Sequence, residues 1–258
     1  MFKKTILTTT FAAVLAFSSQ QANATIVLVE TNMGDFEINL FDQTTPKTVT
    51  NFLNYVKDGS YDNVVFHRSV KDFVVQGGGF RYSGNNTSPF AAVATRGPVD
   101  NEPKLSNVRG TVAMAKVADS PNSATNQWFV NLGNNASNLD RQNSGFTVFG
   151  VVTGTGMSIL DSIEDLYVPA TGNFAGAPLR NYSATDLANN VALTASNLVV
   201  IEKITVINDS PTTAANLNPA PNTLAGQQTD SSSSGGGSMG SALLLALAGL
   251  AFWRRRKV

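Results

Sequence analysis

Apolar and polar residues alternate near the start of the chain in the way typical of paired β-strands. The run Thr25–Glu30 is rich in β-type residues, and in Asp35–Phe41 every second side chain is apolar. Asn32 to Gly34 between these runs favour a turn. The two runs therefore predict a β-hairpin, and its second strand places three apolar side chains on one face: Phe36, Ile38 and Leu40.

A helical pattern follows this hairpin. Thr45 and Pro46 suit the N-cap and the first position of a helix, and Gly59 suits its C-terminal end. Between them, apolar residues recur at the spacing i, i+3, i+4, i+7 that makes one helical stripe: Val49, Phe52, Leu53 and Val56. We therefore expect an amphipathic helix here, and a second helix at Ser158–Glu164.

The remaining β-type runs are short and spread along the chain. They are Val64–Phe66, Phe73–Gln76, Thr111–Ala115, Trp128–Asn131, Thr147–Val152 and Leu198–Ile207. Many short strands with two helices predict a mainly β fold, a closed antiparallel barrel. The stretch Asp165–Asn197 is polar and weakly patterned, so we interpret it as an insertion before the last strand of a domain that spans residues 25–209.

Composition excludes several classes of function. The 258 residues include 18 Lys plus Arg and 18 Asp plus Glu, so the basic excess of a nucleic-acid-binding protein is absent. Without cysteine there is no disulfide, thiol nucleophile or cysteine metal site. One histidine and no clustered carboxylates argue against a metal enzyme. A Ser-His-Asp hydrolase is not indicated because no G-x-S-x-G motif occurs.

Residues 1–24 resemble a secretory signal peptide. Lys3 and Lys4 form a basic start, Ile6–Phe17 is mostly apolar or small, and Ala22-Asn23-Ala24 fits the small-x-small cleavage rule. The alternative is an amphipathic first helix, but no polar face recurs after Lys4. We therefore expect an exported protein whose mature chain begins at Thr25, in the periplasm or at the cell surface.

The C-terminal residues predict a tether and a membrane segment. Residues 210–238 are rich in Pro, Ala, Asn, Thr, Ser and Gly, which favours a flexible linker. Residues 239–253 carry no charge and are followed by Arg254, Arg255, Arg256 and Lys257, so 239–258 predicts a transmembrane segment with a basic stop on the cytoplasmic side. The alternative is a buried core helix.

The order of these C-terminal features also resembles a sorting signal. A Ser/Gly-rich turn, a short apolar helix and an arginine cluster are similar to the glycine-glycine (rhombosortase-type) C-terminal tags of Gram-negative bacteria. In those tags a rhomboid-type protease cuts near the glycines, which here would be Gly235-Gly236-Gly237. The resemblance implies a sorting protease as a partner, and either membrane tethering or release after the tail is processed.

Two long blocks carry the most specific signal in the chain. The first, Phe66–Phe80, reads FHRSVKDFVVQGGGF and contains the only histidine; the second, Gly110–Val130, reads GTVAMAKVADSPNSATNQWFV. Together they resemble the cyclophilins, which are peptidyl-prolyl cis–trans isomerases. The resemblance spans roughly residues 25–209 and implies an antiparallel barrel of eight strands capped by two helices.

The resemblance also implies which residues form the site. Arg68 matches the family's catalytic arginine, and Phe73, Gln76 and Phe129 match the residues that complete the catalytic set. The implied substrate-binding residues are His67, Val74, Ala115, Gln127, Leu139 and Phe146. No cofactor and no metal are implied, and the expected partners are proline-containing polypeptides.

Each of these residues also has a structural explanation. Arg68 could be a solvated charge or half of an ion pair, the phenylalanines could be ordinary core, and the glutamines could satisfy backbone groups. For His67 we favour a hydrogen-bonded structural role over acid–base catalysis. Gly77-Gly78-Gly79 lacks the lysine and helix start of a phosphate loop, so we expect it to allow a tight backbone path at the pocket edge.

Three positions depart from the family pattern. Lys116 and Val117 follow Ala115 where eukaryotic members have Asn-Ala, although bacterial-type members have a basic residue there. Asn138 stands where the family usually has an aromatic residue, which leaves the pocket rim more open and predicts weak cyclosporin binding.

We therefore expect an exported, tethered or surface-sorted isomerase that acts on X-Pro bonds of other exported proteins, with a monomer favoured. One alternative is a catalytically weak proline-peptide binding module or chaperone on the same fold. A second alternative is a structural surface protein in which the barrel is only a carrier.

Overall fold

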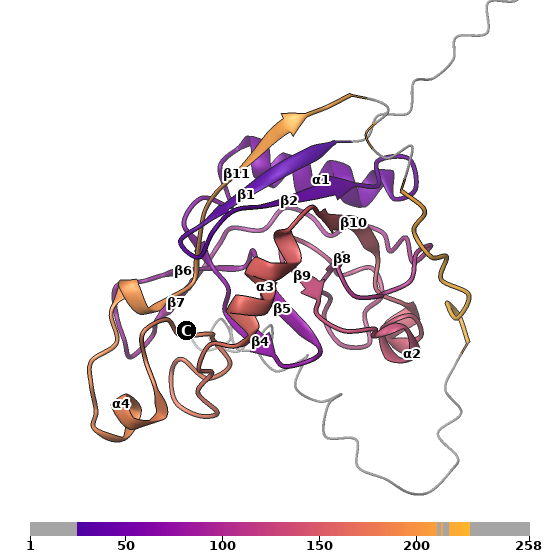
Figure 1. The fold of residues 1–258 in the computed structure, drawn as a ribbon. Helices are drawn as coiled ribbons and strands as arrows, with labels where there is room; N and C mark the ends of the chain where they lie inside the picture. Colours follow the sequence, from indigo (N-terminus) through magenta and orange to yellow (C-terminus); the bar gives the residue numbers. More distant parts are fainter. Residues whose placement is uncertain (1–24, 211–212, 214–216, 228–258) are drawn as a thin grey trace, which may run out of the picture.

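One curled antiparallel sheet forms most of the protein (Figure 1). The computed structural model describes residues 25–210, 213 and 217–227, so the predicted signal peptide (1–24) and apolar C-terminal segment (239–258) lie outside the described residues. Within this part of the chain, eleven strands follow the hydrogen-bonded order β4-β5-β9-β8-β10-β2-β1-β11-β3-β6-β7. None of the helices described is both long and apolar enough to cross a membrane.

The strands are short and occur along the whole described chain. They are β1 (Ile26–Thr31), β2 (Phe36–Leu40), β3 (Val64–Val65), β4 (Arg68–Val70), β5 (Val74–Gly77), β6 (Phe80–Tyr82), β7 (Phe90–Ala92), β8 (Thr111–Met114), β9 (Trp128–Asn131), β10 (Val148–Thr153) and β11 (Val200–Asn208). The predicted hairpin is present, because β1 and β2 pair antiparallel with Val27 opposite Ile38. Alternation along β2 buries Phe36, Ile38 and Leu40 as expected.

Strand β4, at one end of this strand order, is connected through two residues to β3, which lies near the other end. Strands β3 and β4 are separated by Phe66 and His67 alone. The Phe66 N–H donates to the Val199 carbonyl (3.0 Å), whereas the His67 N–H donates to the Gln76 carbonyl (3.1 Å). The mainly β, antiparallel prediction is confirmed, but a closed barrel of eight strands is not: the hydrogen-bonded order is an eleven-stranded curled sheet.

Two longer helices cover the sheet, as the apolar stripes predict. They are α1 (Pro46–Lys57) and α3 (Gly156–Glu164); shorter helical turns are α2 (Ala136–Leu139), η1 (Gln142–Ser144), α4 (Ala184–Ala188) and η2 (Ala195–Asn197). Thr45 is the N-cap residue of α1, but its side chain makes no capping bond. The buried Glu102 takes that role instead, since its carboxylate accepts from the Thr48 N–H (2.9 Å) and the Thr48 hydroxyl (2.8 Å).

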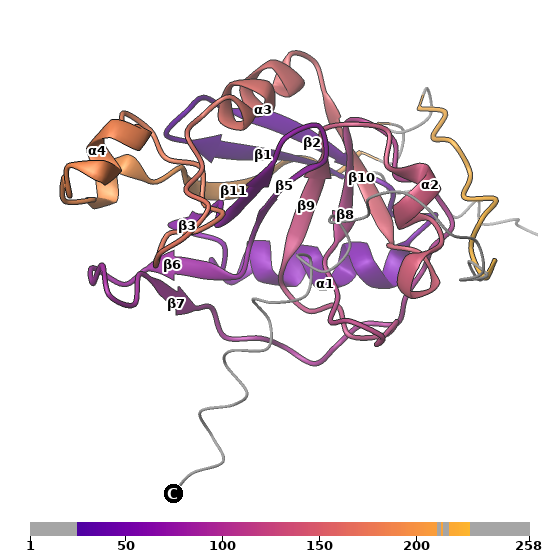
Figure 2. The ribbon, with the colours of Figure 1, turned by 90° about the horizontal axis from the view of Figure 1, so that it is seen from below.

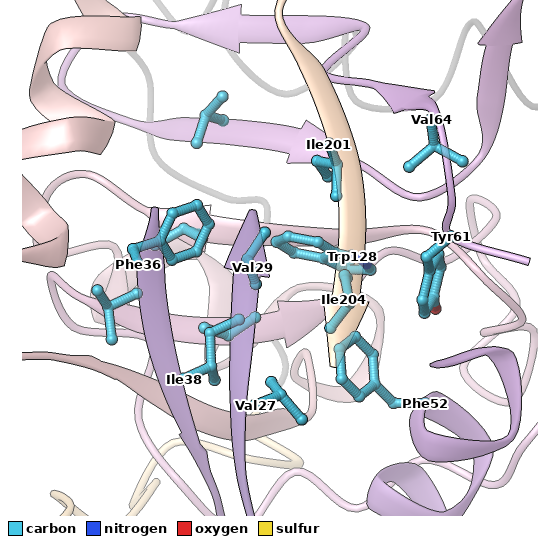
Figure 3. Packing of buried hydrophobic residues seen from close by; sticks show 14 of the residues in the cluster. Val27, Val29, Phe36, Ile38, Phe52, Tyr61, Val64, Trp128, Ile201 and Ile204 are labelled. Atoms are coloured by element: carbon cyan, nitrogen blue, oxygen red, sulfur yellow. The ribbon is translucent and has the colours of Figure 1, made fainter. Parts of the chain in front are cut away.

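Helix α1 packs its apolar stripe into an aromatic core between the helix and the sheet. Phe52 contacts Trp128 edge to face (ring centroids 6.2 Å apart) and also Phe149 (5.1 Å). Figure 3 shows Phe52 and Trp128 together with the labelled inner residues of β1, β2 and β11. Each fully buried side chain of this size contributes roughly 1.5–3 kcal/mol to stability. The core thereby fixes the sheet that carries the site on its other face.

The predicted insertion, Asp165–Asn197, has a small core of its own. Phe174, Leu179 and Tyr182 are buried together with Val65 of β3. The Gly176 carbonyl also accepts from the Ser69 N–H on β4 (2.8 Å). The segment therefore covers the free edge of the strand that carries Arg68, and such covering prevents edge-to-edge association.

Residues 217–225, which we call the strap, lie against the domain although they fall inside the range predicted as a flexible tether. Pro221 forms a β-bridge with Leu105, and the Ser106 N–H donates to the Ala220 carbonyl (2.8 Å). Figures 1 and 2 both place this segment, coloured yellow-orange, beside α2. Residues 217–225 of the predicted tether are thus bound to the domain, and a flexible linker stays a prediction for the parts of 210–238 that lie outside the described residues.

Candidate active site

A single transverse row of residues crosses four neighbouring strands. Arg68 on β4 lies opposite Gln76 on β5, Gln76 lies opposite Phe129 on β9, and Phe129 lies opposite Ala113 on β8. Directly opposed residues of an antiparallel sheet project from the same face. The sheet therefore brings the predicted arginine, glutamine and phenylalanine together, although 61 residues separate the first from the last in numbering (129 minus 68).

Arg68 is buried without a counter-ion. Its side chain is only 5% exposed, its Nη1 has no hydrogen-bond partner, and no described carboxylate forms an ion pair with it. Burial lowers the pKa of the guanidinium to about 10, so the group remains charged at neutral pH. An unsatisfied buried donor is costly, so its presence marks Arg68 as a candidate functional residue.

Gln76 is held in one orientation by a neighbouring glutamine. Its Nε2 donates to Oε1 of Gln127 (2.9 Å), while its own buried Oε1 has no partner. Gln127 in turn lies against Gly79, where a Cβ would come within 2.6 Å of Gln127 Cγ. Gly78 has a φ of +86° and no space for a side chain beside Trp128. The glycine run thus gives the tight path expected at the pocket edge.

An apolar cluster adjoins this polar pair. Phe129 and Phe146 meet edge to face with ring centroids 5.9 Å apart. Six further residues are buried around these two rings: Phe41, Val74, Leu105, Ala113, Leu139 and Val148. Phe73 and Ala115 pack against this cluster and are partly buried. The cluster is entirely apolar, which is the character that binding sites for apolar rings share.

The loop that carries Leu139 and Phe146 is fixed by buried polar groups. The Phe146 N–H donates to the Leu139 carbonyl (2.9 Å). Asp140 accepts from the Ser106 hydroxyl (2.6 Å) and from both the backbone and side-chain nitrogens of Asn107 (2.8 and 2.9 Å). Because the Asp140 carboxylate is 1% exposed and fully hydrogen-bonded, it holds this wall of the pocket in a single position.

Lys116 holds the same loop from the other side. Its buried ammonium donates to the carbonyls of Asn143 and Gly145 (2.7 Å each) and lies 4.7 Å from the centroid of the Phe146 ring. Burial lowers the pKa of this lysine to about 8. In the sequence Lys116 is only a departure from the eukaryotic pattern, and no local signal indicates that its ammonium binds this loop.

His67 lies beside the row but makes different contacts. Its ring packs edge to face on Phe80, with centroids 4.8 Å apart. Burial lowers the pKa of His67 to about 4, and the charge of Arg68 lowers it by a smaller amount. The Val65 backbone and Gln127 act in the opposite direction and raise this pKa. The imidazole is therefore neutral at physiological pH, and its structural role stays a prediction.

The structure thus gathers nearly all of the predicted site residues on one face of the sheet. Arg68, Gln76 and Gln127 form its polar side, and the remaining predicted residues form one apolar cluster: Phe73, Val74, Ala115, Phe129, Leu139 and Phe146. Asn138, the rim residue, is half-buried at the end of α2. No group of three or more His, Cys, Asp or Glu side chains among the described residues could hold a metal ion.

Comparison with protein families gives one match over most of the domain. The family model described as "Cyclophilin type peptidyl-prolyl cis-trans isomerase/CLD" matches residues 26–183. A peptidyl-prolyl cis-trans isomerase of Acinetobacter baylyi is 36% identical over 167 residues, which cover 64% of this chain and 85% of the relative. Peptidyl-prolyl cis-trans isomerase B of Escherichia coli is 38% identical over 159 residues, which cover 59% of this chain and 92% of the relative.

A comparison with solved structures agrees on the fold. A cyclophilin type peptidyl-prolyl cis-trans isomerase of Cryptosporidium parvum superposes with a TM-score of 0.52 at 23% identity, covering 72% of this chain and 99% of that protein. At this level of identity the match concerns the fold alone. The family model ends at residue 183, so both β11 and the strap lie beyond it.

Proposed function

Because the chain belongs to the cyclophilin-type peptidyl-prolyl cis–trans isomerases and is an isomerase, we propose that the row Arg68–Gln76–Phe129 is its catalytic site. Arg68 acts as the donor to the substrate, and the apolar cluster around Phe129 receives the proline ring. One observation carries this proposal: a buried, uncompensated guanidinium with a free donor lies beside an apolar cluster.

The chemistry needs a donor and no nucleophile. Rotation about a peptide bond is opposed by a barrier of ~18–20 kcal/mol because of resonance, and X-Pro bonds exchange in tens to hundreds of seconds. When the bond twists, resonance is lost and the proline nitrogen regains a lone pair. A donor fixed toward that nitrogen stabilises the twisted state more than either planar state, which is catalysis by differential binding.

Arginine suits this role because it stays charged and presents its donors in a rigid fork. A charge-assisted bond of ~1.5–3 kcal/mol accounts for roughly one to two decades of rate. Gln76, which Gln127 orients, offers its free Oε1 to the substrate or to the guanidinium. Phe73, Leu139 and Phe146 would hold the proline ring, while Val74, Ala115 and Gln127 line the groove.

A protease-free isomerase assay on an Ala-Pro peptide tests the proposal. We expect the full chain to accelerate exchange, and Arg68→Ala to bind the peptide while losing most of the acceleration. Binding without acceleration in the wild type would favour the alternative of a peptide-binding module or chaperone on the same fold, for which the supporting observation is Asn138 in place of an aromatic residue.

We further propose that the protein acts on exported polypeptides outside the cytoplasm. This rests on sequence alone: the signal-like residues 1–24 and the apolar segment 239–258 with its basic stop. The protein is then tethered to the membrane in the periplasm or at the cell surface, or is released when a sorting protease cuts near Gly235. No cofactor is required, and a monomer suffices.

A further inference from the structure

The strap, residues 217–225, lies against the loop that forms one wall of the proposed pocket. Its backbone is held at two points, since the Asn222 N–H donates to the Lys104 carbonyl (2.9 Å) and the Ala220 carbonyl accepts from Ser106 (2.8 Å). The same Ser106 donates its hydroxyl to the Asp140 carboxylate. One residue thus connects the strap to the carboxylate that fixes the pocket loop.

Asn222 reaches the loop directly. Its Nδ2 donates to the carbonyl of Asp140 (3.1 Å). Asp140 is the residue after Leu139. Its Oδ1 faces the other way and accepts from the N–H groups of Leu224 (2.8 Å) and Ala225 (2.9 Å). The amide therefore has two separate functions: the nitrogen holds the loop, and the oxygen closes a turn within the strap itself.

The loop leaves no room between itself and the strap. A Cβ at Gly145, which has a φ of +78°, would lie 2.8 Å from the Asp140 carbonyl oxygen and 3.1 Å from Asn222 Nδ2. Gly145 immediately precedes Phe146 and also accepts the bond from Lys116.

The strap also extends the apolar side of the site. Leu217 packs against the apolar cluster of the site, which contains Phe41, Leu105, Phe129 and Phe146. Leu105 is in turn bridged to Pro221. The strap thus covers the end of the apolar cluster that is continuous with the proposed proline pocket.

We propose that the strap is a working part of the isomerase site, in which Asn222 is a positioning residue that holds the wall formed by Leu139 and Phe146. This inference rests on the proposed function of the site. The strap does not contact Arg68, so it acts on the binding of the proline side and not on the donor. Loss of the contact weakens the ground state and the transition state equally, which raises KM and leaves kcat unchanged.

Three variants of the full chain test this. Asn222→Ala removes both functions of the amide, whereas Asn222→Asp keeps the oxygen that closes the turn and removes the donor to Asp140. We expect each to raise KM for an Ala-Pro peptide roughly three- to tenfold, with kcat within about twofold of wild type. Gln227→Ala is the matched control, because its side-chain bond to the Thr223 carbonyl (3.1 Å) stays outside the loop, and it should leave both constants unchanged.

Amide hydrogen exchange supplies a second, independent readout. The Phe146 N–H, bonded to the Leu139 carbonyl, should exchange faster in both Asn222 variants, whereas the amides of β1 and β11 should keep their protection. An unchanged KM in Asn222→Asp overturns the proposal, and so does a loss of protection throughout the sheet, which indicates a merely structural contact. If the wild type lacks isomerase activity, the proposed function fails, and the dissociation constant of the peptide then replaces KM in testing the strap.

Discussion

Arg68 and Gln76 lie directly opposite each other on β4 and β5, and each keeps one buried polar atom without a partner. The free atom of Arg68 is a donor and that of Gln76 is an acceptor. A peptide presents both complements, a carbonyl oxygen and an N–H, and a twisted proline nitrogen adds a further acceptor. The proposed site therefore combines one unpaired donor and one unpaired acceptor on adjacent strands, and a polypeptide offers complements to both.

Replacing the arginine should separate catalysis from folding. We expect Arg68→Ala to lower turnover by one to three decades, at about 1.4 kcal/mol per decade. The domain should stay folded, because no described carboxylate loses an ion-pair partner. Isomerase kinetics together with far-ultraviolet circular dichroism measure the two effects.

Arg68→Lys is the control for charge alone. A lysine keeps the positive charge but lacks the planar fork, so it should rescue little of the lost rate. Near-normal turnover in a folded Arg68→Ala protein would show that the donor lies elsewhere.

The rim of the pocket should govern the binding of cyclosporin. Asn138 is half-buried next to Leu139 and offers no aromatic surface to a ligand. We expect the wild type to bind the drug weakly and Asn138→Trp to bind it more tightly, with the peptide assay as the readout. Nanomolar inhibition of the wild type would mean that another residue supplies the rim.

Acid should destabilise the protein through His67. Its pKa is about 4 in the folded protein, mainly because of burial, against an ordinary value of 6.5. Between these values the unfolded chain binds a proton that the folded protein does not, so stability present above pH 6.5 is lost as the pH falls toward 4. By pH 4.5 the loss should be about 2–3 kcal/mol.

His67→Gln should abolish this part of the pH dependence, since glutamine does not titrate. Urea unfolding at pH 7.5 and pH 4.5 gives the difference for each protein. Equal losses in wild type and variant would exclude the histidine as the source.

The mature ends of the protein can be determined by intact-mass analysis of native material. Processing at both ends should give a chain that starts at Thr25 and ends near Gly235–Ser238, whereas a plain anchor would retain Val258. Recovery from the cytoplasm with both Met1 and Val258 present would contradict export.

Local patterns predicted the parts of the fold that depend on local periodicity. The β1–β2 hairpin and the stripe of α1 both appear where the alternation and the helical spacing place them. Strands β4, β6 and β7 were missed because three residues each are too few to show a period. Thr45 is the N-cap residue of α1 as predicted, but the side-chain bond to the first turn comes from Glu102, and a carboxylate 54 residues from Thr48 leaves no local signal.

The candidate site likewise has a part that the sequence predicts and a part that it does not. Arg68, Phe73, Gln76 and Phe129 were predictable because two contiguous blocks carry them. The contacts that fix the pocket wall were not, because they depend on tertiary placement. Lys116 lies beneath the loop, and Asn222 comes from a segment whose composition indicates a linker.

The pairing of β1 with β11 sets when the protein can become active. Ile26 is paired with Asn208, and β11 also pairs with β3. Strands from the two ends of the domain's sequence are therefore neighbours in the middle of the sheet. Contacts between residues this far apart in sequence form slowly, since a long loop must close first. A ribosome or a translocation channel that still holds residue 208 therefore holds a chain whose sheet is incomplete. The complete sheet can therefore form only after the last strand has emerged.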